Sequence, residues 1–181
     1  MNYSFLKSLV ILCLAMAAMN AATSQKIRTV LSYNVCEGFQ KDSMQKERFI
    51  SWVKQFNPDV IAFQELNGFT HTTLEEMAAR YGHHYVVLQK EWGYPSGITS
   101  RYPITDIEKR SDDFSMAYVY GRILDFHFFA IHLNPFQYQK RLTQISSVLA
   151  QAGRINKKDK IIILGDFNSL SSSDSLQAKK E

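Results

Sequence analysis

The stretch Ile161-Ile162-Ile163-Leu164-Gly165-Asp166-Phe167-Asn168 joins a run of aliphatic residues to a polar end. Four consecutive branched or long aliphatic residues are typical of a short β-strand that is buried on both faces. Gly165 allows a sharp turn after this strand, so that Asp166 and Asn168 present a carboxylate and a carboxamide at the edge of the sheet. An ordinary Asx-type turn is the alternative interpretation, because Gly, Asp and Asn are common turn residues.

The remaining chain alternates between strand and helix patterns. Apolar or alternating runs predict strands over residues 29–33, 60–63, 85–88, 97–100, 104–110, 116–120 and 123–133. Apolar side chains at helical spacing predict helices over residues 49–56, 72–81 and 136–152. We expect Thr72 or Thr73 to cap the second helix and Gly121-Arg122 to form a hairpin turn. The pattern indicates an α/β protein.

Composition and charge are those of one globular domain. The 181 residues are 45% hydrophobic and 21% charged, and the formal net charge is +4. A mildly basic balance suits an anionic substrate. The tightest basic cluster, Lys157, Lys158 and Lys160, contains Asp159 and is typical of a solvated loop rather than a nucleic-acid patch.

The first 24 residues have the layout of a secretory signal peptide. Lys7 precedes an apolar run from Leu9 to Ala18, and small residues follow. We expect cleavage after Ala22 or Ser24, a secreted or periplasmic protein, and a domain over residues 25–181. A membrane anchor is the alternative, but the run is shorter than the roughly 20 residues of a spanning helix, so no stable membrane span is expected. Cys36 would then be the only cysteine, and we expect it to be a buried, inert thiol.

Polar side chains close three of the predicted strands. Asn34 follows the first strand, Glu65 the second, and Asp166 with Asn168 the last. If these strands are neighbours in a sheet, their ends meet at one rim, where open α/β sheets tend to bind ligands. Hard oxygen ligands suit Mg²⁺, Mn²⁺ or Ca²⁺ rather than Zn²⁺. Since Mg²⁺ often binds one or two protein carboxylates together with a substrate phosphate, the rim indicates phosphate-ester chemistry.

A histidine near the end of an alternating strand is a further candidate. The imidazole of His132 could donate a hydrogen bond to a phosphoryl oxygen. A structural role is the alternative, since a lone histidine in a strand is more often structural, and the other four histidines carry a weaker signal. Trp92, Tyr94 and Phe136 could line a substrate pocket, although core or exposed positions are the commoner outcome for aromatic residues.

Five segments together resemble the endonuclease/exonuclease/phosphatase family. They are, in chain order, Ser32-Tyr33-Asn34, Pro58-Asp59-Val60-Ile61-Ala62-Phe63-Gln64-Glu65, Gly97-Ile98-Thr99-Ser100-Arg101-Tyr102-Pro103-Ile104, Ile131-His132-Leu133 and Gly165-Asp166-Phe167-Asn168. The resemblance implies a four-layer α/β/β/α sandwich of two mixed β-sheets. It also implies a phosphate-ester substrate, which the sequence leaves open between nucleic acid, phospholipid, inositol phosphate and other esters.

The resemblance implies a role for each candidate residue. Glu65 is similar to the principal metal ligand of the family, and Asn34 to a metal or phosphate contact beside it. Asp166 resembles the residue that orients and deprotonates the attacking water, and Asn168 the residue that hydrogen-bonds the phosphoryl oxygens. His132 resembles the histidine that serves substrate binding or leaving-group protonation. The implied reaction is in-line attack of an activated water on phosphorus, with Mg²⁺ neutralising charge.

The chain departs from the family pattern after Asn168. Family members continue to a Ser-Asp-His-like motif, which neither Asp174 nor a later histidine supplies before Glu181. We therefore expect the second sheet to be incomplete, with open edges. Two hypotheses follow: an exported metal-dependent phosphoesterase, represented by its N-terminal two-thirds, or a truncated, non-catalytic remnant or binding module. No obligate protein partner is evident.

Overall fold

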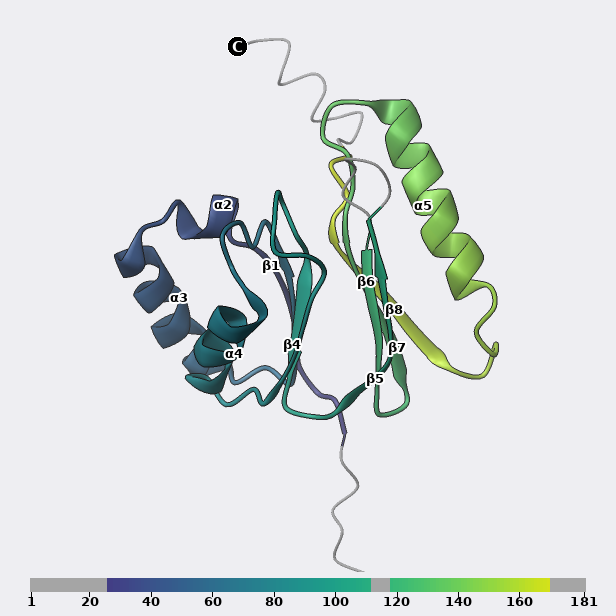
Figure 1. Cartoon of the computed structure of the whole chain (residues 1–181). Coiled ribbons are helices and arrows are strands. Elements are labelled where there is room, and N and C mark those ends of the chain that lie inside the picture. Colours follow the sequence, from purple (N-terminus) through teal and green to yellow (C-terminus); the bar gives the residue numbers. More distant parts are fainter. Residues whose placement is uncertain (1–25, 112–117, 170–181) are drawn as a thin grey trace, which may run out of the picture.

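The computed structural model describes residues 26–111 and 118–169. Two four-stranded sheets lie face to face, and helices cover their outer sides, so the order of layers is helix, sheet, sheet, helix (Figure 1). The predicted four-layer α/β/β/α sandwich of two mixed sheets is therefore confirmed. The signal-peptide segment and Asp174 lie outside the described residues. Within the described part, no helix is long and apolar enough to cross a membrane.

The first sheet carries its most buried strand in an interior position. Its strand order is β1 (Val30–Asn34), β2 (Val60–Gln64), β4 (Gly97–Ser100) and β3 (Tyr85–Leu88), with β1 and β2 parallel and the other pairs antiparallel. Every residue of β2 is buried, as expected for a continuous apolar run. Helices α3 (Ser43–Phe56) and α4 (His71–Ala79) cover the outer face, and the short α2 (Cys36–Phe39) follows β1.

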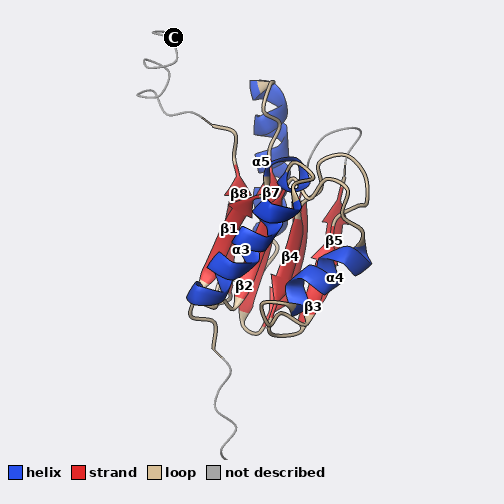
Figure 2. Ribbon diagram, turned by 90° about the vertical axis from the view of Figure 1, so that its left-hand side faces the viewer, coloured by secondary structure: helices blue, strands red, loops and turns tan. Residues whose placement is uncertain are grey.

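The second sheet ends in a parallel pair. Its strand order is β5 (Ile104–Arg110), β6 (Tyr118–Ile123), β7 (Phe126–His132) and β8 (Lys160–Asp166). Helix α5 (Tyr138–Ala152) connects β7 to β8 and covers the outer face, so these two strands run parallel while the other pairs are antiparallel. Strands β1 and β8 lie at the same side of the two sheets, where each is an edge strand (Figure 2).

Alternating apolar residues from both sheets fill the space between them. This cluster contains Val60, Ala62, Ile98, Val119, Ile123, Phe128 and Ala130, all with almost no exposed surface. Burying apolar surface stabilises a fold by about 25 cal/mol per Å², and this favours the packing of the two sheets over exposure of either face. The two sheets are thereby fixed face to face, and so are the strand ends at their rims.

Two local predictions are wrong. Thr70, rather than Thr72 or Thr73, caps α4: its hydroxyl accepts from the Thr73 amide (3.2 Å), and the Thr73 hydroxyl accepts from the Thr70 amide (2.9 Å). Gly121-Arg122 lies inside β6, and the hairpin turn falls between Ile123 and Phe126. Gly121 is needed for packing, because a Cβ atom there would lie 2.5 Å from Ile104 Cγ2.

Strand β8 is less buried than its sequence indicates. We expected burial on both faces, but its side chains are half-buried or exposed, and Ile161 is among the exposed ones. The reason is its position, since β8 pairs only with β7 and has a free edge on its other side within the described residues. An apolar run corresponds to a largely buried strand only when the strand has neighbouring strands on both sides.

Candidate functional site

Four polar side chains meet where four strands end. Asn34 ends β1 and Glu65 follows β2, and these strands are parallel with Asn34 opposite Gln64. His132 ends β7 opposite Asp166, the last residue of the parallel strand β8. The Asn34 amide nitrogen Nδ2 donates to Glu65 Oε1 (2.9 Å) and to Asp166 Oδ2 (3.2 Å). Two parallel pairs, one in each sheet, therefore bring these residues to one rim.

His132 lies beside both carboxylates. Its Nε2 atom is 3.9 Å from Glu65 Oε1 and 4.0 Å from Asp166 Oδ2. The residue is 3% exposed, and its buried Nδ1 atom has no hydrogen-bond partner among the described residues. Burial lowers the pKa of His132, while Asp166 and Glu65 act in the opposite direction. Burial therefore favours the neutral ring, and Nε2 is the ring nitrogen that lies beside the two carboxylates.

Asp166 is held by the residues on either side of it, Gly165 before and Asn168 after. Gly165 has φ of +140°, and a Cβ atom there would lie 2.0 Å from the Ile131 carbonyl oxygen, so only glycine fits. The backbone amide of Asn168 donates to Asp166 Oδ1 (2.9 Å). The Asn168 side chain donates to the Leu133 carbonyl (2.7 Å). Asn168 thus fixes the loop after β7 and the Asp166 carboxylate, while Asp166 Oδ2 stays directed at Asn34.

Residues 36–41, which include the segment labelled α2, form a left-handed turn that holds Glu65. All six of its residues have φ between 50° and 69°. The Glu37 amide donates to Glu65 Oε2 (2.8 Å), and the Gly38 amide donates to the Glu65 carbonyl (2.8 Å). The sequence predicts only a polar loop here. The expectation of a buried thiol is also wrong, because Cys36 lies in this turn and is exposed.

Both oxygens of Glu65 are therefore oriented by the protein. Asn34 donates to one oxygen and the Glu37 amide to the other. Asn34 is oriented in turn, because its Oδ1 atom accepts from the Cys36 amide (2.9 Å). Asn34 thus presents Nδ2 to the carboxylates, and this donor positions Glu65 and Asp166 relative to each other.

The donor set fits a hard cation with few protein ligands. The described residues contain no group of three or more His, Cys, Asp or Glu side chains arranged to hold a metal ion. Glu65 and Asp166 nevertheless converge on the Asn34 amide and offer two carboxylates. Mg²⁺ commonly binds one or two carboxylates and completes its shell with water and substrate oxygens. The two carboxylates are thus compatible with Mg²⁺, Mn²⁺ or Ca²⁺. Asn34, the other predicted metal residue, presents to them Nδ2, a hydrogen-bond donor that does not bind a cation.

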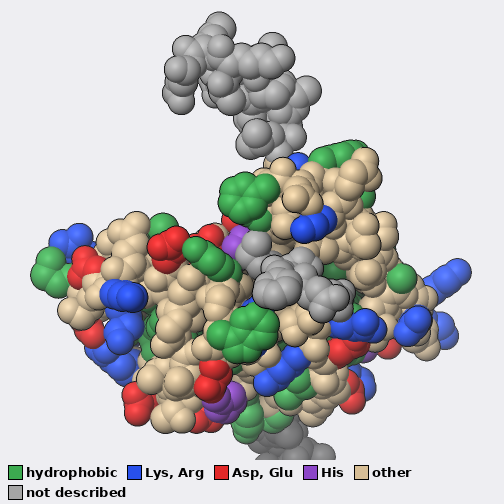
Figure 3. Space-filling model, turned by 45° about the horizontal axis from the view of Figure 1, so that its top comes forward, with side chains coloured by type: hydrophobic (Ala, Val, Ile, Leu, Met, Phe, Trp, Pro, Cys, Tyr) green, Lys and Arg blue, Asp and Glu red, His purple; other side chains and the backbone are tan. Residues whose placement is uncertain are grey.

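Three exposed aromatic residues were predicted to line a substrate pocket. Trp92, Tyr94 and Phe136, the predicted pocket residues, are all exposed rather than enclosed. Figure 3 shows hydrophobic side chains on the same face as acidic and histidine side chains. Tyr94 has the closest link to the site, because its hydroxyl donates to Glu37 Oε1 (3.1 Å). The sequence gives no signal for this contact, which joins residues 57 positions apart.

Several solved structures are similar to this chain, whereas no curated protein sequence matches it. Humanized D. rerio TDP2 with 14 mutations has 19% identity and a TM-score of 0.61, covering 83% of this chain and 69% of that chain. A β-hairpin deletion mutant of beta toxin from Staphylococcus aureus has 17% identity and a TM-score of 0.58, covering 83% and 70%. An AP endonuclease from Archaeoglobus fulgidus has 16% identity and a TM-score of 0.58, covering 82% and 62%. Identities this low show a shared fold.

The family follows from a match over most of the sequence. Residues 31–181 match the model of the Endonuclease/Exonuclease/phosphatase family. The matched region contains all five candidate residues and every described strand except the first residue of β1. Members of this family are phosphoric ester hydrolases, in agreement with the carboxylates, amide and imidazole at the rim. This chain therefore belongs to the Endonuclease/Exonuclease/phosphatase family.

Proposed function

We propose that the protein is an exported, divalent-metal-dependent phosphoesterase that hydrolyses a phosphodiester or a phosphomonoester. The observation that carries the proposal is the convergence of Asn34, Glu65, His132 and Asp166 at one rim. Export rests on the sequence of residues 1–24. A non-catalytic remnant is the alternative, and the gathering of two carboxylates, an amide and an imidazole at one rim does not favour it.

Each residue has a role that its contacts support. Glu65 would hold the metal, with its two oxygens oriented by Asn34 and the Glu37 amide. A bound Mg²⁺ supplies neutralisation of the charge on the phosphoryl group. Asp166 orients the attacking water and accepts its proton, and the Asn168 amide fixes the carboxylate for this task. Neutral His132 offers a hydrogen bond to a phosphoryl oxygen or to the leaving group.

Asn168 has a positioning role beside the one that the resemblance implies. Its side-chain nitrogen donates one of its two hydrogens to the Leu133 carbonyl, and the second hydrogen is left for a phosphoryl oxygen. We also assign Asn168 the orientation of Asp166 through its backbone amide.

The similar structures support a phosphate-ester substrate. They include the AP endonuclease, a D. rerio TDP2 complexed with a single-strand DNA product, and a Neisseria 3′ phosphatase, NExo, bound to a product DNA hairpin. Two of these structures hold a DNA product, and one of those two is named as a phosphatase. We infer the same class of bond for this chain and leave open whether the ester is part of a nucleic acid, a phospholipid or an inositol phosphate.

The test is hydrolysis of bis(p-nitrophenyl) phosphate with Mg²⁺ and with a chelator. We expect chelator-sensitive turnover, and Asp166→Asn should lower kcat by about 10²–10⁴, the usual contribution of a general base. Asp106→Asn is the matched control, because Asp106 is exposed on β5 and should leave kcat unchanged. Circular dichroism should show that both variants are folded. Chelator-resistant turnover, or full activity of Asp166→Asn, would contradict the proposal.

A further inference from the structure

An exposed tyrosine is linked to Glu65 through two hydrogen bonds. The Tyr94 hydroxyl donates to Glu37 Oε1 (3.1 Å), and the backbone amide of Glu37 donates to Glu65 Oε2 (2.8 Å). The Glu37 carboxylate raises the pKa of Tyr94, so the hydroxyl keeps its proton throughout the neutral range. Among the described side chains, Tyr94 alone donates to the Glu37 carboxylate. The exposed loop and the site are thus connected.

The left-handed turn needs restraint to persist. For residues other than glycine, the left-handed conformation costs about 1–2 kcal/mol each, and five of the six residues in the turn are not glycine. The exception, Gly38, lies so close to Asn67 that a Cβ atom would be 2.1 Å from the Asn67 carbonyl oxygen. Bonds to neighbouring segments must therefore offset the strain, and without them the turn would relax away from Glu65.

The loop that carries Tyr94 is itself anchored. The backbone amide of Gln89 donates to the Ser96 carbonyl (2.9 Å), and the backbone amide of Ser96 donates to the side-chain oxygen Oε1 of Gln89 (3.1 Å). The Leu66 amide donates to the Pro95 carbonyl (3.0 Å), which ties the loop to the residue after Glu65. Tyr94 therefore projects from a fixed base and can restrain the turn.

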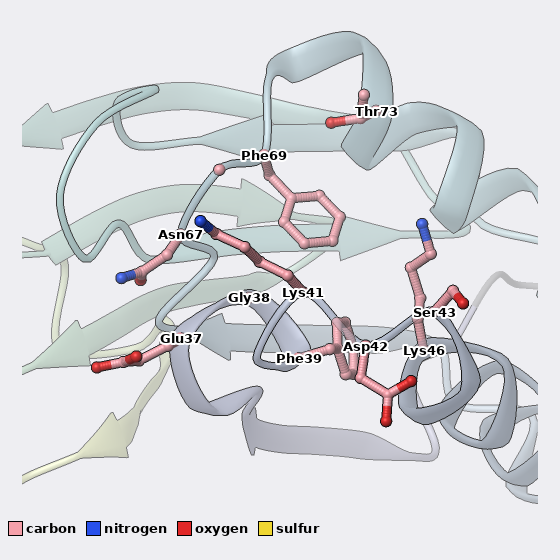
Figure 4. Close-up of a pocket in the computed structure, with 11 residues that line it drawn as sticks. Glu37, Gly38, Phe39, Lys41, Asp42, Ser43, Lys46, Asn67, Phe69 and Thr73 are labelled. Carbon is pink, nitrogen blue, oxygen red and sulfur yellow. The ribbon is translucent and has the colours of Figure 1, made fainter.

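Glu37 lies at a cavity, but its carboxylate points away from the interior. The cavity has a volume of about 470 Å³, and its lining includes Glu37, Lys41, Lys46 and Phe69. In Figure 4 the Glu37 side chain points away from Phe69 and from the interior of this cavity. Neither Lys41 nor Lys46 forms an ion pair with Glu37 among the described contacts, so the hydroxyl of Tyr94 is what holds this carboxylate.

We propose that Tyr94 and Glu37 are positioning residues that hold the turn, residues 36–41, against Glu65 and so keep its carboxylate in one orientation for the reaction. The orientation of Glu65 for the reaction rests on the proposed function. Without the Tyr94 bond, the Glu37 amide should leave Glu65 Oε2 more often. Glu65 would then be restrained at one oxygen only, by Asn34.

The first experiment compares Tyr94→Phe with Tyr85→Phe. The two tyrosines are matched in exposure, at 42% and 41%, and the hydroxyl of Tyr85 makes no hydrogen bond within the described part of the chain. Hydrogen exchange is followed by mass spectrometry on a peptide that contains residues 36–41, without substrate. We expect faster exchange at the Glu37 and Gly38 amides in Tyr94→Phe and no change in Tyr85→Phe.

Kinetics of the same variants give the second measurement. Tyr94→Phe should lower kcat on bis(p-nitrophenyl) phosphate about tenfold and raise the Mg²⁺ concentration for half-maximal rate, with KM for substrate unchanged. Glu37→Gln retains an acceptor for Tyr94 and should keep most activity, whereas Glu37→Ala should resemble Tyr94→Phe.

The outcomes separate this inference from the proposed function. If the wild-type protein hydrolyses nothing, the proposed function fails, and unchanged exchange in Tyr94→Phe would additionally overturn the restraint of the turn. If the wild-type protein is active, unchanged exchange or unchanged kcat in Tyr94→Phe overturns the inference. A rise in KM without faster exchange also overturns it, because Tyr94 would then contact substrate directly.

Discussion

Two of the three histidines that are buried in the described part of the chain, His83 and His132, lie in different regions and have different surroundings. His83 lies between α4 and β3 and is 1% exposed, and His132 lies at the rim and is 3% exposed. Burial lowers the pKa of both. His83 has partners at both ring nitrogens, Thr99 Oγ1 and the Pro58 carbonyl, each at 2.8 Å. Because a carbonyl only accepts, Nε2 of His83 carries the proton and Nδ1 accepts from Thr99.

His132 has no such arrangement. Its Nδ1 atom is without a described partner, and its Nε2 atom faces two carboxylates at about 4 Å. A buried polar atom without a partner costs about 1–3 kcal/mol, and His83 avoids this cost at both ring nitrogens. Burial and a lowered pKa do not distinguish the two histidines. The position of His132 beside both Glu65 and Asp166 at the rim does.

The largest expected effect is a separation of activity from stability. His132→Gln should lower kcat on bis(p-nitrophenyl) phosphate by about 100-fold or more, since it would remove the imidazole that we propose as a hydrogen-bond donor to the phosphoryl group. His83→Gln should leave kcat unchanged while lowering the free energy of unfolding by about 2 kcal/mol, because buried partners lose their bonds. Activity and urea denaturation are measured on both variants. Loss of activity in both variants, or in neither, would contradict the assignment of activity to His132 and of stability to His83.

The pH dependence of stability should also depend on His83. Its pKa is about 4 in the folded protein and 6.5 as a model value, because desolvation by burial disfavours the charged ring. Above pH 6.5 both states are neutral, and as the pH falls from 6.5 towards 4 only the unfolded state gains the proton. The free energy of unfolding should therefore fall by about 3 kcal/mol over this range and then level off.

Urea denaturation at several pH values measures this effect. His83→Gln should lack this part of the pH dependence. His84→Gln is the matched control, because His84 is the adjacent residue and is exposed, so it should behave as wild type. An equal pH dependence in wild type and His83→Gln would show that His83 does not carry the effect.

The smallest expected effect concerns the outer member of the His83 network. The Tyr81 hydroxyl lies 3.3 Å from Thr99 Oγ1, and since Thr99 donates to His83, Tyr81 is the donor. Tyr81→Phe should lower the free energy of unfolding by about 1 kcal/mol and leave kcat unchanged. Tyr85→Phe, at an exposed position, should change neither quantity. A change in kcat with Tyr81→Phe would show that the two regions are coupled.

The strand ends could be predicted because each depends on local sequence. Apolar runs followed by Glu65 and by Gly165-Asp166 give strands with polar ends, and the structure brings these residues together with Asn34 and His132. Their catalytic and metal roles stay predictions. Only the register of two parallel pairs, one per sheet, turns separate strand ends into one cluster, and that register is not local.

The left-handed turn could not be predicted. Apart from Gly38, its residues have no intrinsic preference for positive φ, and the conformation is supported by acceptors on Glu65, 28 residues after Glu37. The exposure of β8 depends likewise on the absence of a second neighbour among the described strands. The error at Gly121 has a different cause, because a glycine needed for close packing resembles a turn glycine in sequence.

The bond from Asn34 to Asp166 has a consequence for how the protein matures. It joins residues 132 positions apart, so a long loop must close before it can form. Loop closure becomes entropically harder with length, and contacts of this kind are slow to form. During synthesis, Asp166 leaves the ribosome after all other strands of the described fold. The rim can therefore assemble only once both sheets are in place, so a partly made chain lacks the complete rim.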